Sequence, residues 1–244
     1  MKKIIYFVSI ITLLSSCSKE EKEPTTLSVN FTQTVDGETL LMLCCGGEGS
    51  FPYTNEAGEK YNIQTLKYII SNIVLHDGDG NSIPIKDFHF VDLADELTWQ
   101  FEAEQLSNGN YTSLSLSMGL DESMNISDVY LNEAWHASML WPNMMGGGYH
   151  YMKLEGAYNN DSTFYNTHTG STAGIDYSFN IDLPINLNIE NDLGNIAIDI
   201  NMEINNWYKN PNIYNLSGGI MGDTSKQISL QQNGFTDVFS ISIN

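Results

Sequence analysis

The sequence contains no arginine, so its ten cationic side chains are all lysines, and thirty Asp and Glu residues outnumber them. The formal net charge at pH 7 is −20, which would repel the phosphate backbone of a nucleic acid and argues strongly against nucleic-acid binding. No long apolar run follows the N-terminal one, which excludes a polytopic membrane protein. The 244 residues are 41% hydrophobic, enough to bury a sizeable core, so intrinsic disorder is not expected.

The N-terminus has the pattern of an export signal. Lys2 and Lys3 precede an apolar stretch, residues 4–14, that is too short to span a membrane. The Leu-Ser-Ser-Cys sequence that ends at Cys17 resembles a bacterial lipobox, in which the cysteine is acylated and becomes the first mature residue. We therefore predict a lipoprotein signal peptide at residues 1–16 and acylation of Cys17.

A polar, charged segment follows, and we interpret residues 17–26 as an acylated tether. Its Lys-Glu-Glu sequence at 19–21 fits either a plain linker or a surface-export signal. The predicted location is the outer membrane, with the protein facing the periplasm or the cell surface, and the lipid on Cys17 is the predicted membrane attachment.

The two remaining cysteines, Cys44 and Cys45, are adjacent in the sequence. Neighbouring residues of an extended chain point to opposite faces, and a vicinal disulfide is strained, so a structural bridge between them is not expected. They are interpreted as two free thiols or as a soft metal site.

From Leu27 onward, hydrophobic residues alternate with polar ones in several segments, a period of two that is typical of half-buried strands. The segments cover residues 27–35, 114–118, 179–189, 196–204 and 239–243. Turns are predicted by clusters of Asp, Asn, Ser and Gly at 76–81, 107–110 and 146–148. We predict one all-β domain over residues 27–244, an antiparallel β-sandwich with long loops. At most two short helices are expected, at about 63–71 and 202–208, and both segments fit a strand equally well.

Motifs of common enzymes are absent from the sequence. It has no Gly-x-Ser-x-Gly elbow, His-Glu-x-x-His helix, Walker loop or Gly-x-Gly-x-x-Gly turn. The acidic loop that begins at Asp77 resembles a calcium loop, but its twelfth position is Phe88 instead of the glutamate that an EF-hand requires. Carboxylate pairs are so common in this chain that none singles out a hydrolase site. No catalytic activity is predicted.

The region from His136 to His168 concentrates imidazole and thioether side chains, with three of the five histidines and four of the ten methionines. The residues of interest are His136, Met139, Trp141, Met144, Met145, His150, Met152 and His168. Imidazole and thioether suit copper, and thioether favours Cu(I). Strand alternation predicts that His150 and Met152 point the same way. Methionines that fill a β-core, with a histidine satisfied by a carbonyl, would explain the same pattern.

Ten short segments of the chain have a characteristic order and spacing. They read V-N-F at 29–31, V-D-G-E at 35–38, Y-T-N-E-A-G-E-K-Y at 53–61, L-K-Y-I-I-S-N-I at 66–73, M-L-W-P at 139–142, G-Y at 148–149, K-L-E-G at 153–156, T-H-T-G-S at 167–171, N-W-Y at 206–208 and D-V-F at 237–239. Taken together, they resemble the MbnP-like copper-binding family from about Leu27 to the C-terminus.

The resemblance implies an exported β-sandwich that holds one copper ion through two histidines and, in some members, a kynurenine. The kynurenine is made from a tryptophan by a partner di-haem enzyme related to bacterial peroxidases. Trp141 matches the aromatic residue of the family's Met-x-Trp motif, and His168 matches the histidine of its His-x-Gly-Ser motif. The second histidine is His150 or, alternatively, His136. Relatives often carry a second tryptophan where this chain has Asn143, so the chain departs from the family beside Trp141.

Indole offers no basic lone pair to a metal, whereas kynurenine presents an aniline nitrogen and a ketone oxygen, so conversion would turn Trp141 into a ligand. We predict a lipid-anchored copper-binding protein that sequesters or delivers copper and catalyses no reaction. The alternative is a surface glycan- or protein-binding lipoprotein that stacks its ligand on aromatic side chains, Tyr149, Tyr151, Trp135 and Trp99.

Overall fold

The computed structural model describes residues 25–42, 50–103, 106–190 and 194–244. The predicted signal peptide at 1–16, the lipidation site Cys17, most of the tether at 17–26, and the pair Cys44 and Cys45 lie outside the described residues. Within the described ranges, none of the helices is long and apolar enough to cross a membrane.

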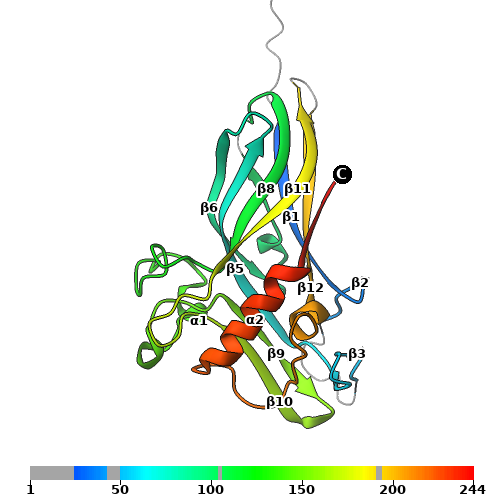
Figure 1. Ribbon diagram of the computed structural model, residues 1–244, viewed down its shortest axis with the longest axis vertical. Coiled ribbons are helices and arrows are strands. Elements are labelled where there is room, and N and C mark those ends of the chain that lie inside the picture. The colour runs from blue at the N-terminus through cyan, green and yellow to red at the C-terminus, as the bar shows by residue number, and fades with distance from the viewer. Residues whose placement is uncertain (1–24, 43–49, 104–105, 191–193) are drawn as a thin grey trace, which may run out of the picture.

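Two β-sheets form the body of the protein, which confirms the predicted all-β sandwich (Figure 1). The first sheet has the order β13 (Phe239–Ile243), β12 (Asn195–Glu203), β1 (Thr26–Val35), β2 (Glu38–Thr39), with β7 (Gln100–Ala103) also paired to β1. The second has the order β11 (Phe179–Ile189), β8 (Gly109–Met118), β5 (Thr65–Asp77), β9 (Met152–Tyr158), β4 (Lys60–Tyr61), β3 (Tyr53–Thr54). Two further strands pair with it, β10 (Asn160–Thr169) on β9 and β6 (Ser82–Asp92) on β5.

Nearly all of this pairing is antiparallel, as predicted, but β1 and β12 run parallel, with Leu27 opposite Ile196. Parallel neighbours need a long connection between them, and here the whole second sheet lies between the two strands in the sequence. The main core fills the space between the sheets. Alternate residues of β1, such as Leu27 and Phe31, are buried there against residues of the second sheet such as Ile70.

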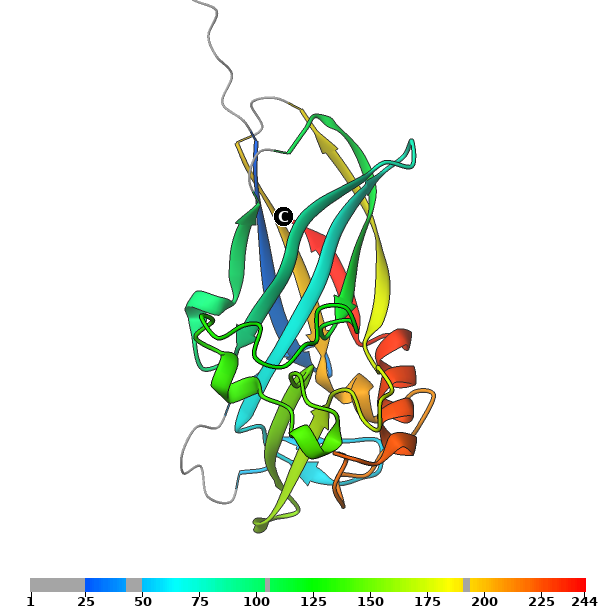
Figure 2. The ribbon, with the colours of Figure 1, turned by 90° about the vertical axis from the view of Figure 1, so that its left-hand side faces the viewer.

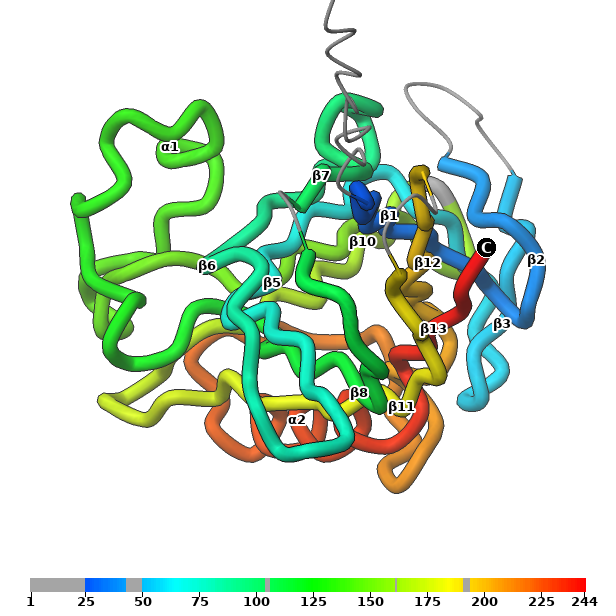
Figure 3. Tube along the Cα trace, turned by 90° about the horizontal axis from the view of Figure 1, so that it is seen from above, coloured from blue at the N-terminus to red at the C-terminus, as the bar shows by residue number. Residues whose placement is uncertain are grey.

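A second, smaller hydrophobic cluster lies on the outer face of β5 and β6. It is built from Ile69, Leu120, Trp135, Met139 and Tyr149. The loop region that supplies most of these residues also carries the short helices α1 (His136–Met139) and η2 (Asn143–Met145), and it extends outward beyond β6 (Figure 3). Figure 2 shows this region crossing in front of the lower part of the β5–β6 hairpin.

This second cluster explains why the segment at about 63–71 is a strand, the second of its two predicted alternatives, and why the helical one is wrong. Residues 65–71 belong to β5, in which Tyr68, Ile69, Ile70 and Ser71 are all buried in succession. A strand that is covered on both faces has no polar alternation, so its sequence does not reveal a period of two. The helix predicted at 202–208 is confirmed in part, as the 3-10 helix η3 (Ile204–Tyr208) that directly follows β12.

The helix α2 (Thr224–Thr236) was not predicted. It begins after Asp223, whose carboxylate accepts hydrogen bonds from the backbone N–H groups of Ser225 and Lys226, as an N-cap does. The helix packs closely, because a Cβ added to Gly234 would clash with the ring of Phe179. In Figure 1 α2 crosses the molecule diagonally, and it packs against η3 and β11.

Candidate metal centre

Three chain segments meet at the end of the second sheet and bring the candidate ligands together. Leu140 and Tyr149 form an isolated antiparallel bridge, flanked by hydrogen bonds from Trp141 N to Gly148 O (2.9 Å) and from His150 N to Met139 O (2.7 Å). The chain then continues from His150 into β9, whose neighbour β10 carries His168 opposite Lys153. Trp141, His150 and His168 therefore come from adjacent segments of one sheet edge.

The three side chains form a buried row. The ring centroids of Trp141 and His150 are 4.7 Å apart with an interplanar angle of 77°, and those of His150 and His168 are 4.9 Å apart at 85°. The exposed fractions are 2% for Trp141, 5% for His150 and 8% for His168. The structure thus places two imidazoles edge to face, with the indole against the first of them.

His150 has one ring nitrogen without a partner. Its Nδ1 lies 3.1 Å from the carbonyl oxygen of Met139, which can only accept, so Nδ1 carries the proton and Nε2 carries the lone pair. Nε2 is buried and forms no hydrogen bond. Burial, and secondly the neighbouring His168, lowers the pKa of His150 to about 4. The ring is therefore neutral at pH 7, and its orphaned acceptor is the form of imidazole that binds metals.

His168 bonds to an oxygen acceptor through Nε2, whereas His150 does so through Nδ1. Its Nε2 lies 2.7 Å from Oε1 of Glu155, and the hydrogen bond from His168 is the main cause that lowers the pKa of Glu155 to about 2. A carboxylate accepts only, so Nε2 carries a proton, and in the neutral ring the lone pair is then on Nδ1. A carboxylate that holds the second nitrogen of an imidazole is the usual support of a metal-binding histidine. Nδ1 itself lies 3.2 Å from the sulfur of Met221.

Helix α2 holds the strand that carries His168. Gln227, which is 1% exposed, donates from Nε2 to the carbonyl of His168 (2.9 Å) and accepts from the N–H of Gly170 (3.3 Å). Gly170 in turn allows close approach of Trp141, because an added Cβ would lie 2.7 Å from Cε3 of the indole. The indole Nε1 is buried without a hydrogen-bond partner.

The other candidate histidine, His136, lies elsewhere. Its Nδ1 is 2.9 Å from the hydroxyl of Tyr149, and its Nε2 is 3.9 Å from the carboxylate of Asp128. Tyr149 belongs to the second hydrophobic cluster, whereas the ring of His150, the next residue, contacts Trp141 and His168. The pair that the structure brings together is therefore His150 and His168.

The expectation that His150 and Met152 share a face is wrong. Met152 is part of the main core, whereas His150 lies against His168 on the side where Glu155 is found. The cause is a bend at Tyr151, after which β9 begins at Met152. Alternation cannot be extrapolated across a bend.

The aromatic platform expected for a glycan-binding protein is also wrong. Tyr149, Tyr151 and Trp135 are 0%, 1% and 6% exposed, so their faces are covered by neighbouring side chains. The rings of Trp135 and Tyr149 pack on each other at 5.3 Å, and Trp99 is half-buried, with Nε1 bonded to the carbonyl of Asp92. Tyr149 and Tyr151 are core side chains, so the four aromatic residues do not form one exposed platform on which a sugar ring could stack.

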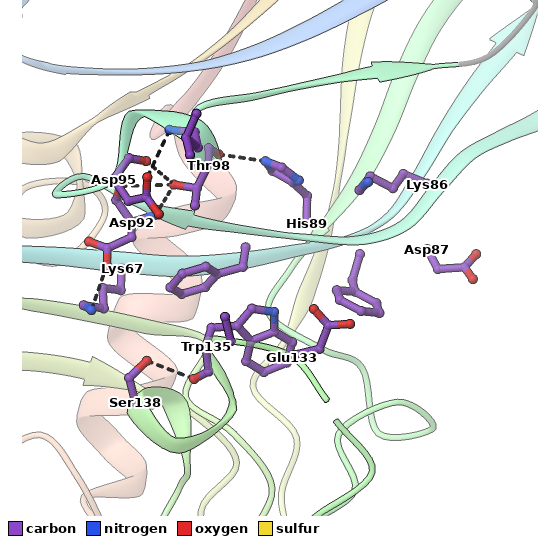
Figure 4. A pocket seen from close by; sticks show the side chains of 14 residues that line it. Lys67, Lys86, Asp87, His89, Asp92, Asp95, Thr98, Glu133, Trp135 and Ser138 are labelled. Carbon is purple, nitrogen blue, oxygen red and sulfur yellow. Dashed lines mark hydrogen bonds and ion pairs between the residues drawn. The ribbon is translucent and has the colours of Figure 1, made fainter. Parts of the chain in front are cut away.

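A groove of about 690 Å³ lies beside this second cluster, between β6 and the segment that leads into α1 (Figure 4). Trp135, Glu133 and Ser138 line it on one side, and Lys86 and Asp95 line it on the other. None of Trp141, His150 and His168 lines this groove.

In the part of the chain that the structure describes, no group of three or more His, Cys, Asp and Glu side chains could hold a metal ion. The candidate centre has two imidazoles, and the thioether of Met221 and the indole of Trp141 lie beside them. Neither Glu155 nor Met221 was singled out as a site residue from the sequence.

The comparisons with known proteins agree with this architecture. None of the curated proteins matches the chain. Among solved structures, the chain is similar to MbnP from Methylosinus trichosporium with a TM-score of 0.59 and 12% sequence identity, over 91% of this chain and 99% of that one. At this identity the likeness concerns the fold. The family model MbnP matches residues 24–222. The chain therefore belongs to the MbnP family, which is associated with copper handling.

Proposed function

We propose that the protein binds copper between His150 and His168 and works by sequestering or delivering the ion, without catalysing a reaction. The observation that carries the proposal is the pair of buried, adjacent imidazoles, in which one nitrogen of each ring is held by an oxygen acceptor while Nε2 of His150 has no partner and Nδ1 of His168 faces the sulfur of Met221. The carbonyl of Met139 holds His150, and the carboxylate of Glu155 holds His168. Burying two nitrogen acceptors in this way costs free energy unless an ion or a proton binds to them.

The donor set fits copper. Imidazole nitrogens suit copper and zinc, and copper stands at the top of the divalent affinity order. A thioether beside them favours Cu(I) further. The strongly acidic chain, with a formal net charge of −20, attracts cations to its surface and raises their local concentration.

Trp141 supplies a third ligand in this proposal if a partner oxidises it to kynurenine. Its indole ring is next to His150, so the aniline nitrogen and ketone oxygen of kynurenine would arise beside an existing ligand. A di-haem enzyme related to peroxidases is the proposed partner. The conversion breaks the C2–C3 bond of the indole, takes its oxygen from water, releases C2 as formate and gives up four electrons to the partner. Trp141 is only 2% exposed, so the electrons have to pass through intervening side chains, or the loop at 142–148 has to open.

The cellular setting of the proposal is an outer membrane lipoprotein that faces the periplasm or the cell surface, attached through acylated Cys17. The lipobox-like sequence before Cys17 supports this part. Copper is available to such a protein before it enters the cell, which suits sequestration or delivery.

Copper titration of histidine variants tests the function. His168→Ala and His150→Ala are each expected to lower copper affinity at least about tenfold, because a site of few ligands has no replacement for a lost imidazole. His136→Ala, and His76→Ala on the β5–β6 hairpin, are the matched controls and are expected to bind copper as the unaltered protein does. Equal copper affinity in the unaltered protein and in His168→Ala would remove the proposed centre.

A further inference from the structure

We propose that Met221 is a thioether ligand of the same metal centre and makes it selective for Cu(I) over Cu(II). The inference rests on the proposed function, because it adds a ligand to the pair His150 and His168. The observation that motivates it is the contact between Met221 Sδ and His168 Nδ1, which are 3.2 Å apart. Met221 is 53 positions from His168 in the sequence, outside the region where sequence patterns pointed to ligands.

The contact joins two atoms that both carry lone pairs. Glu155 accepts the proton of His168 at Nε2, which leaves Nδ1 as an acceptor in the neutral ring. A thioether sulfur has no hydrogen to donate and is itself a weak acceptor. In this neutral tautomer neither atom can donate to the other, and a cation between them would satisfy both lone pairs.

The separation of the two atoms suits a shared metal ion. Metal–nitrogen bonds to histidine are about 2.0 Å long, and metal–sulfur bonds are about 2.3 Å long. A nitrogen and a sulfur bound to one ion are therefore about 3.1 Å apart if the N–metal–S angle is a right angle, and about 3.5 Å apart if it is tetrahedral. The observed 3.2 Å falls between these values. His150 is 5% exposed, its Nε2 has no partner, and its ring lies next to that of His168, so it offers a third lone pair nearby.

The backbone on both sides of Met221 is held in place. Ile220 before it is 3% exposed in the main core, and the N–H of Asp223 donates to the Ile220 carbonyl (3.0 Å). Asp223 then caps α2, and the same helix holds the carbonyl of His168 through Gln227. One helix therefore positions the sulfur and the imidazole relative to each other, which lowers the entropy cost of binding the ion.

Thioether selects between the two oxidation states of copper. Soft sulfur ligands prefer Cu(I), whereas imidazole serves both states. Loss of the Met221 sulfur should therefore weaken Cu(I) binding and leave Cu(II) binding nearly unchanged. Loss of the sulfur should also lower the reduction potential of the bound copper, by about 59 mV for each tenfold loss of Cu(I) affinity relative to Cu(II) affinity.

The test compares Met221→Leu with Met144→Leu in the mature full-length protein. Leucine keeps the volume and apolar character of methionine, so only the sulfur is lost. Met144 is 89% exposed and reports the effect of removing a thioether from the surface. Both variants carry Cys44→Ser and Cys45→Ser, because thiolates bind Cu(I), and mass spectrometry confirms the same state of Trp141 in all samples. Affinity for Cu(I) is measured by competition with a chromophoric chelator, and affinity for Cu(II) by a separate titration.

Met221→Leu is expected to lose at least about tenfold in Cu(I) affinity and less than about threefold in Cu(II) affinity, with Met144→Leu unchanged. X-ray absorption of the Cu(I)-loaded protein gives a second readout, a sulfur neighbour that disappears in Met221→Leu and remains in Met145→Leu. Unchanged Cu(I) affinity in Met221→Leu, or equal losses for both oxidation states, would overturn the inference while the histidine site stands. Absence of copper binding in the unaltered protein would overturn both.

Discussion

Replacement of Gly170 by alanine is expected to disturb the metal centre, because the added methyl group would press on the indole of Trp141. The new Cβ would lie 2.7 Å from Cε3 of Trp141 and 2.9 Å from Cδ2 and Cζ3, whereas carbon atoms in contact prefer about 3.5–4.0 Å. The indole would have to move by roughly 1 Å. It cannot move freely, because the ring of His150 lies against it with centroids 4.7 Å apart.

The backbone is also prevented from moving away. The N–H of Gly170 donates to Gln227, and the carbonyl of His168 accepts from the same side chain. Overpacking of a rigid site typically costs about 1–3 kcal/mol, so Gly170→Ala should lower the free energy of unfolding by this amount. A displaced indole would push His150 from its present position and should weaken copper binding as well.

Urea denaturation followed by tryptophan fluorescence measures the first effect, and copper titration measures the second. A shift of the midpoint with an unchanged m value indicates a loss of stability. Gly219→Ala is the control, because an added Cβ there meets nothing within 4 Å, and its stability should stay within about 0.5 kcal/mol of the unaltered protein. If Gly170→Ala matched this control in both measurements, the close packing of Trp141 on Gly170 would not be a constraint on the site.

Two further predictions concern the pH dependence of folding and the state of Trp141. Burial lowers the pKa of His89 to about 4, so the ring stays neutral in the folded protein, whereas the unfolded chain protonates it near pH 6.5. The free energy of unfolding therefore falls as the pH decreases from 6.5 to 4, by roughly 3 kcal/mol at most. Glutamine at this position cannot titrate, so the unfolding free energy of His89→Gln should fall less between pH 6.5 and 4 than that of the unaltered protein. Equal falls in the two proteins would contradict the low pKa of His89. Trp141 is expected to carry an oxidative mass change of kynurenine type in protein from the native host and to lack it in protein from an unrelated host. Peptide mass spectrometry over residues 138–153 measures this, and an unmodified Trp141 in copper-loaded native protein would leave a centre without kynurenine.

Much of the fold could be predicted because most strands have one face toward the core and one toward water. β1, β8, β11, β12 and β13 each show this alternation in sequence. The signal failed in β5, where a second cluster covers the outer face. It also failed in α2, whose buried face includes the polar residues Gln227 and Asn233 in place of an apolar stripe. The N-cap sequence that starts at Asp223 was the available sign of this helix.

For the candidate site, the sequence by itself determined the ligand types and pointed to Trp141 and His168 through the family resemblance. It could not choose between His150 and His136, because spacing along the chain does not say to which side each ring turns. The choice depends on the bridge between Leu140 and Tyr149 and on the bend at Tyr151. Met221 and Gln227 reach His168 only through the placement of α2. Contacts between segments so distant in the sequence arise from sheet and helix packing, so the tertiary structure alone decided which donors face one another.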